Sequence, residues 1–262
     1  MDLGIVLEDS FAYAKDGLLK NPDTWLKLIN LTLLPVIPII VWVLFMIFNA
    51  PSLASHPMVA ASLGIGFGIA IIIAIILSAF YSGYTLKILR GEKTLPPVVN
   101  FGTLFVDGIK YLIINFIYII PAVIVFCITV VPALISMLQF IMGTALPAMK
   151  DAFMGMMLGI LLTIIVAIIL SLFAIIGVVR FARTGAMGEA FRFSAILATI
   201  RKMGWCNYIM ALLFMMAIVM VIVGVFSLFP VIGVIIQFII TPFIGIFTMR
   251  YICLLYESAG TA

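Results

Sequence analysis

Long apolar stretches without a single charged residue dominate the chain. Four of them are Leu28–Leu86, Tyr111–Met149, Ala152–Val179 and Met203–Met249. A helix needs about 20 apolar residues to cross a bilayer core, and a backbone that faces lipid must satisfy its hydrogen bonds internally, which favours helices. The stretches do not alternate apolar and polar residues, as the strands of a membrane barrel do. The pattern therefore predicts an all-α, polytopic bundle of transmembrane helices.

The lengths of these stretches predict six spans in one transmembrane domain, 1–262. The first and fourth are long enough for helical hairpins. We expect the first to break at 49–51 and at the 55–57 turn, and the fourth to break near 230–233. The second is too long for one straight helix and short for two, so we expect one span followed by a segment along the outer interface, 132–146. A separate crossing by 133–149 is the alternative and would make seven spans. The predicted spans are about 26–48, 59–86, 111–131, 153–179, 205–229 and 233–255.

The composition excludes several classes of protein. Hydrophobic residues make up 66% of the chain and charged residues 9%, and the mean hydropathy is +1.40. Soluble domains are about half apolar and roughly a quarter charged. A soluble enzyme, a nucleic-acid-binding domain and a disordered chain are all excluded by this composition.

The basic residues predict the orientation in the membrane. Thirteen of the fourteen lie before the first span, in the 87–110 and 180–202 loops, or near the C-terminus, and only Lys150 falls on the other side. Lys and Arg in short loops mark the cytoplasmic face, so we expect a multi-pass protein of the cell membrane with both termini in the cytoplasm. The sequence pI of about 9.0 suits contact with anionic headgroups and gives no indication of nucleic acid.

Each cytoplasmic segment before an odd-numbered span has the apolar periodicity of a short amphipathic helix. We expect such helices in the interface plane, at about 3–19, 100–110 and 188–203. Each is followed by an aromatic residue at the membrane entry, Trp25, Tyr111 or Trp205. The chain is thus consistent with three degenerate units of one helix plus one hairpin, or with an ordinary series of membrane hairpins.

The chain offers little of the chemistry that catalysis or metal binding requires. Its three cysteines are scattered and its only histidine is His56, so neither a disulfide framework nor a metal site is expected, and no cofactor is implied. No ionisable residue lies in a span core, which argues against proton-coupled transport. Gln139 and Gln237 fall towards the outer leaflet, where they could face each other or line a channel for a small neutral solute.

The residues most suited to a function form a basic rim on the cytoplasmic side. Such a surface can hold lipid phosphates or dock a protein partner. Two acidic residues lie among them: Asp107, three residues before Lys110 and able to pair with it, and Glu189. An enzyme acting on lipid headgroups through these carboxylates is a third alternative. The basic rim comprises Lys87, Arg90, Lys110, Arg180, Arg183, Arg192, Arg201 and Lys202.

Small residues four apart predict close helix packing. The second span has two rows with this spacing, and the fourth span repeats it. The rows are Ala60, Gly64 and Gly68, then Gly66, Ala70 and Ala74, and in the fourth span Gly155 and Gly159. Packing within the bundle is the simpler interpretation, and a face for homo-oligomerisation is the alternative.

Two cytoplasmic loops carry a resemblance to a known family. The motifs are Gly83-Tyr84 and Asp107-Gly108, then the run from Val179 to Gly185 and Gly204-Trp205. Together they resemble the DUF4013-like family of small polytopic membrane proteins, found mainly in archaea. The resemblance implies a membrane bundle without an established activity. With the missing catalytic groups, it leads us to expect a non-catalytic protein that organises lipids or a partner through the basic rim.

Overall fold

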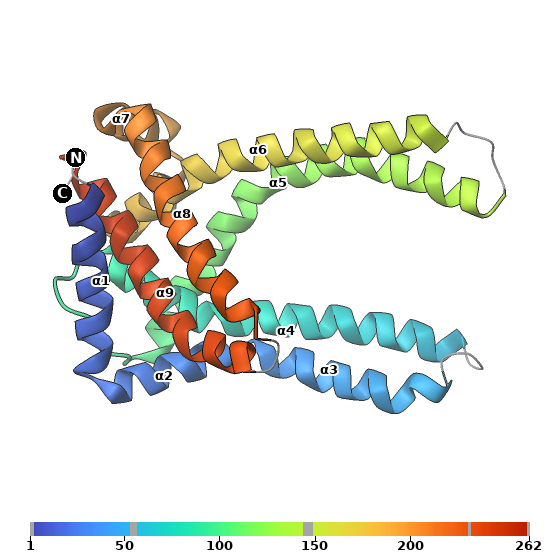
Figure 1. The fold of residues 1–262 in the computed structure, drawn as a ribbon, viewed down its shortest axis with the longest axis horizontal. Helices are drawn as coiled ribbons and strands as arrows, with labels where there is room; N and C mark the ends of the chain where they lie inside the picture. The colour runs from blue at the N-terminus through green and yellow to red at the C-terminus, as the bar shows by residue number, and fades with distance from the viewer. Residues whose placement is uncertain (1–2, 53–56, 144–148, 230–231, 261–262) are drawn as a thin grey trace.

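The computed structural model describes residues 3–52, 57–143, 149–229 and 232–260, and within these ranges every regular element is a helix (Figure 1). Of the predicted hairpin breaks, 55–56 and 230–231 lie outside the described residues. Position 49 ends one helix and 50–51 lie in a short 3₁₀ helix, while 57 and 232 begin the next helices. The longer helices are α1 Leu3–Leu19, α2 Pro22–Leu33, α3 Val36–Asn49, α4 Pro57–Leu89, α5 Phe101–Ile141, α6 Met149–Thr184, α7 Phe193–Met203, α8 Trp205–Ser227 and α9 Ile232–Glu257. Two short 3₁₀ helices, η1 Ala50–Ser52 and η2 Met187–Phe191, complete the described elements.

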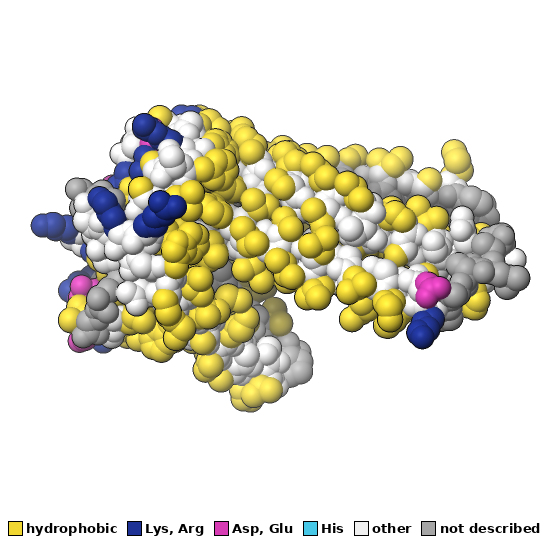
Figure 2. All heavy atoms as spheres, turned by 90° about the horizontal axis from the view of Figure 1, so that it is seen from above, with side chains coloured by type: hydrophobic (Ala, Val, Ile, Leu, Met, Phe, Trp, Pro, Cys, Tyr) yellow, Lys and Arg dark blue, Asp and Glu magenta, His cyan; other side chains and the backbone are white. Residues whose placement is uncertain are grey.

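The helices form two diverging arms that join at one end. The α3–α4 hairpin and the outer part of the α5–α6 hairpin extend to the right in Figure 1, while both termini, α1 and α7 gather on the left. Figure 2 shows Lys, Arg, Asp and Glu side chains concentrated at this left end, which we call the charged end. Lys150 and Asp151 are the exception, because they begin α6 at the far tip of its arm.

Five described helices are long and apolar enough to span a membrane, or six if a bent pair counts as one span. That pair is α2 and α3, which meet at an angle of 43°. The bend falls at Pro35, which lacks an N–H and whose ring clashes with the carbonyl four residues earlier, so the helix cannot continue straight. The chain therefore has the helices of a multi-pass membrane protein, in agreement with the apolar pattern.

The second hairpin differs from the prediction. We expected a separate interfacial helix at 100–110, a span at 111–131 and a segment along the interface from Pro132, but α5 runs unbroken from Phe101 to Ile141. Pro121 and Pro132 lie inside it. In an apolar helix each proline removes one hydrogen bond and bends the axis, whereas ending the helix would leave many more backbone groups unsatisfied. Residues 133–141 therefore extend α5, and 144–148 lie outside the described residues.

Separate short helices occur at the other two predicted positions. α1 has the expected bounds, 3–19, and η2 with α7 occupies the stretch predicted at 188–203. The middle segment has no such helix because it is part of α5. A threefold repeat therefore stays a prediction, matched in outline by two of its three units.

Backbones touch where α4 crosses α5, near the charged end. A Cβ at Gly83 would lie 1.8 Å from the carbonyl oxygen of Leu104, and one at Gly108 would lie 1.7 Å from that of Ala79. Only glycine permits such an approach. The crossing fixes the two arms to each other.

The four-residue spacing of small residues did not correctly predict every place where helices pack closely. A Cβ at Gly64, Gly68 or Gly155 would meet nothing within 4 Å, so these three pack against no helix within the described chain, and a self-association face there stays a prediction. A Cβ at Gly66 would lie 3.4 Å from the Trp42 ring, so this glycine does face a neighbouring helix. Gly159 does pack, because its Cβ would lie 2.8 Å from the Thr129 hydroxyl. In lipid a small residue is a permissive feature, and a neighbouring helix must be present to use it.

Candidate functional site at the charged end

Arg183 joins three helices at the charged end. Its Nε donates to the carbonyl oxygen of Leu89 at 2.9 Å, its guanidinium contacts the Cys253 Sγ at 3.2 Å, and it pairs with the Glu257 carboxylate. Gly91 adopts φ +89°, and a Cβ there would lie 2.7 Å from the same guanidinium. This side chain therefore holds together the ends of α4, α6 and α9.

A second ion-pair cluster holds η2 against α6. Glu189 pairs with Arg180 and, at 3.0 Å, with Arg192. Hydrogen bonds from Arg180 and then Arg192 hold the pKa of Glu189 below its usual range. Next to Glu189, the Tyr118 hydroxyl donates to the carbonyl oxygen of Ala190 at 2.6 Å. Together these contacts attach the 187–191 turn to α5 and α6.

Asp107 pairs with Arg90, at 2.5 Å, and not with Lys110 as its spacing suggested. The pair joins the end of α4 to α5, beside the Gly83–Gly108 crossing. Lys87 donates to the carbonyl oxygen of Val99 at 3.3 Å. Helix spacing permits an i,i+3 pair, but the loop after α4 brings the guanidinium of Arg90 nearer to the carboxylate.

α7 carries the rim residues that point outward. Ile196 and Ile200 on one face are buried, whereas Arg201 and Lys202 in the last turn are exposed. Within the described ranges no carboxylate lies within 4 Å of either cation, nor of Lys110. Arg201 and Lys202 therefore present two adjacent cations that the rest of the charged end does not neutralise.

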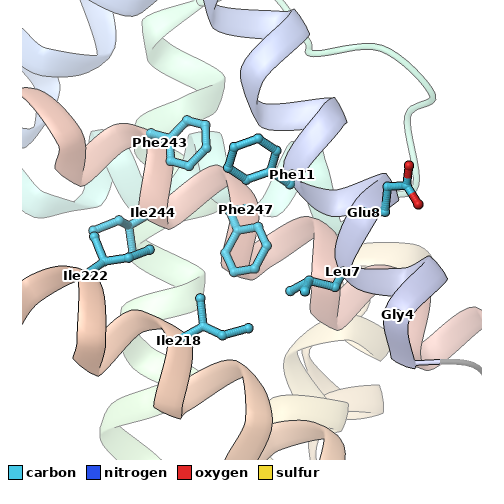
Figure 3. Close-up of a pocket in the computed structure, with 9 residues that line it drawn as sticks. All are labelled: Gly4, Leu7, Glu8, Phe11, Ile218, Ile222, Phe243, Ile244 and Phe247. Carbon is cyan, nitrogen blue, oxygen red and sulfur yellow. The ribbon is translucent and has the colours of Figure 1, made fainter.

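An apolar groove lies between α1, α8 and α9 (Figure 3). Its volume is about 400 Å³. Phe11 of α1 and Phe243 and Phe247 of α9 lie close together in it, while the Glu8 carboxylate points away. The remaining lining residues are Gly4, Leu7, Ile218, Ile222 and Ile244. The groove can hold a hydrocarbon chain.

The two glutamines proposed for a channel do not lie side by side. Gln139 lies in the last turn of α5 at the tip of one arm, whereas Gln237 lies near the start of α9, beside the other arm (Figure 1). The Gln237 side chain donates to the carbonyl oxygen of Val223 on α8 at 3.3 Å. A channel lined by one of these glutamines stays a prediction.

Several residues of the charged end were missing from the predicted site. Glu257 and Cys253 contact Arg183, and Arg250 contacts Tyr13 and Glu92. Glu257 is the only acidic residue after Glu189, which was a usable signal for an ion pair at the end of the last helix. In the part of the chain that the structure describes, no group of three or more His, Cys, Asp or Glu residues could hold a metal ion.

Comparison with known proteins identifies one family. The sequence profile described as a protein of unknown function, DUF4013, matches residues 66–254, which include most of α4, all of α5 to α8 and nearly all of α9. No curated protein and no solved structure matches the chain.

Proposed function

The chain belongs to the DUF4013 family, and from that premise we propose that it is a non-catalytic integral protein of the cell membrane that organises lipids around its charged end. The charged end and both termini face the cytoplasm in this proposal. The support is the distribution of basic residues, because thirteen of fourteen belong to the segments on that side and such residues are retained there.

The proposal rests on a difference among six residues of the basic rim. Four arginines form ion pairs with carboxylates of the same chain, although the Arg192 side chain is 64% exposed: Arg90, Arg180, Arg183 and Arg192. Arg201 and Lys202 have no such pairing among the described residues and are exposed on α7. Exposed cations beside the bilayer surface attract anionic headgroups, at about 1 kcal/mol per Lys or Arg. We therefore assign headgroup contact to α7 and a structural role to the paired arginines.

The ion pairs also favour a non-catalytic role. Asp107 and Glu189, the carboxylates considered for catalysis, each contact an arginine. Hydrogen bonds from its arginines lower the pKa of Glu189, which makes it a weak base and a poor proton donor near neutral pH. The groove of Figure 3 adds a place for an acyl chain next to the same end.

Lipid retention in native mass spectrometry tests the proposal. We would reconstitute the protein in nanodiscs of equal parts phosphatidylglycerol and phosphatidylcholine and count the lipids that remain bound after ejection. Lys202→Gln should lower the retained phosphatidylglycerol, and Arg201→Gln should act likewise. Lys150→Gln is the matched control, because it removes the same charge from the opposite end of the molecule.

Equal lipid retention in Lys202→Gln, Lys150→Gln and the wild type would contradict the assignment to α7. If a co-purifying protein, rather than lipid, is lost from Lys202→Gln and Arg201→Gln alone, the surface serves a protein partner and the lipid proposal is wrong.

A further inference from the structure

Arg250 differs from the four paired arginines of the charged end. It lies on α9, and within the described ranges no carboxylate is within 4 Å of its guanidinium. Its Nη1 donates to the carbonyl oxygen of Glu92 at 3.3 Å, and its Cζ lies 4.7 Å from the centre of the Tyr13 ring. Its Nε is buried without a hydrogen-bond acceptor. The Arg250 guanidinium is thus held in place, but its Nε–H has no acceptor and its charge has no carboxylate partner among the described residues.

Arg250 lines a polar pocket of about 450 Å³ between α1, α9 and the loop that follows α4. The pocket lies on the other face of α1 from the apolar groove, because its α1 residues, such as Tyr13 and Asp16, fall opposite Leu7 and Phe11 on the helix. The Tyr13 hydroxyl donates to the carbonyl oxygen of Thr94 at 3.1 Å. Burial raises the pKa of Tyr13 to about 12, so this phenol is neutral and the loop stays attached to α1.

The charges in the lining leave an excess of one cation. Lys20 and Asp16 neutralise each other at 2.9 Å. Among the remaining lining residues, Arg250 and Lys93 stand against the single carboxylate of Asp9. The Glu92 carboxylate is not part of the lining, although its charge acts on Tyr13. An anion in the pocket would supply the partner that Arg250 lacks.

We infer that this pocket binds a phosphate group, with Arg250 as its main contact and Lys93 as the second. The planar, multi-donor guanidinium suits phosphate oxygens, and the lysine adds a point charge. The phosphate comes from a lipid headgroup or from a soluble phosphate compound. This binding site goes beyond the lipid organisation proposed above, because α7 contributes no residue to its lining.

Calorimetric titration with inorganic phosphate tests the soluble source, using the protein in detergent at constant ionic strength. Arg250→Gln should weaken binding about 10- to 100-fold, because hydrogen bonds to charged groups contribute that much. Lys93→Gln should weaken it roughly two- to fivefold, as expected for an exposed cation. Lys15→Gln is the matched control, because it removes a lysine of α1 that does not line the pocket, and it should bind like the wild type.

The lipid arm uses the same variants in phosphatidylglycerol–phosphatidylcholine nanodiscs, read by native mass spectrometry. A retained lipid that is lost in Arg250→Gln and reduced in Lys93→Gln, without any binding of inorganic phosphate, identifies a headgroup as the source. Phosphate binding with the predicted order of variants identifies a soluble compound. If Arg250→Gln does not fold, Lys93→Gln compared with Lys15→Gln decides. The inference is overturned if neither probe distinguishes the pocket variants from Lys15→Gln.

Discussion

The charged end and the two arms follow different rules of construction. At the charged end α4 and α5 are in backbone contact, and ion pairs such as Arg183–Glu257 join residues far apart in the sequence. Along the arms large apolar side chains point outward, and Phe48 and Met58 are 81% and 83% exposed. An arm in lipid needs only to be apolar and helical, because lipid tails are as apolar as leucine and do not drive helices together. At the charged end the helices must be placed accurately, because each ion pair or hydrogen bond there requires a particular donor and acceptor at the right distance.

A single added methyl group should give the largest difference in unfolding free energy between the two regions. Gly83→Ala places a Cβ against the Leu104 carbonyl, and we expect it to lower the free energy of unfolding by about 3 kcal/mol or more, through overpacking and displacement of the helices. The measurement is unfolding in mixed detergent micelles. Gly68→Ala, on the same helix with open space around it, is the control and should be neutral or slightly stabilising. Equal losses in both variants would remove the distinction between the regions.

Removing the central ion pair should have the next largest effect. Glu257→Gln leaves the largely shielded Arg183 without its carboxylate, and we expect a loss of about 2 kcal/mol. Asp151→Asn at the far tip of the α6 arm is the matched control and should change the free energy of unfolding by less than about 0.5 kcal/mol. A double-mutant cycle with Arg183→Gln would isolate the pairwise energy, and an energy near zero would show that the pair does not hold α6 and α9 together.

Tyr118→Phe removes a buried hydrogen bond without changing the shape of the ring. Its hydroxyl donates to Ala190 at 2.6 Å, so the variant leaves a buried carbonyl without a donor. We expect a loss of about 1 kcal/mol and more frequent local opening near 187–191, which accelerates proteolysis there. Ser171→Ala is the control, since that exposed hydroxyl bonds only within its own helix. Unchanged proteolysis in Tyr118→Phe would indicate that the ion pairs of Glu189 hold the turn by themselves.

A change of pH is expected to have the smallest effect on the stability of the charged end. The pKa of Glu189 is lowered in the folded protein by Arg180 and Arg192 from an ordinary value near 4.5, so its stabilisation is present above that pH and is lost as the pH falls through the lowered folded value. The melting temperature of the wild type should therefore fall more between pH 6 and acid pH than that of Glu189→Gln. Parallel pH profiles would show that the exposed ion pair contributes nothing measurable.

The residues of the charged end show which features of the site the sequence predicts and which it does not. The eight residues of the basic rim were found as positive charges outside the spans, because charge and span length are local properties of the sequence. The sequence did not show which of them form ion pairs. Arg183 pairs with Glu257, 74 residues away, and Asp107 pairs with Arg90 in preference to Lys110. In α5 we expected the span to end before Pro132, but the helix continues because an apolar helix in lipid has no alternative partner for its backbone.

Local chemistry thus determined that the chain is an all-helical, multi-pass membrane protein, because the transfer of charge and of unpaired backbone into lipid is costly wherever it occurs. Only the tertiary arrangement decided which glycines touch a backbone, which arginines are neutralised and which cations point outward. Those outcomes depend on distances between segments that the sequence separates by tens of residues, and a difference of a few ångströms determines whether an arginine meets a carboxylate in the protein or a phosphate outside it.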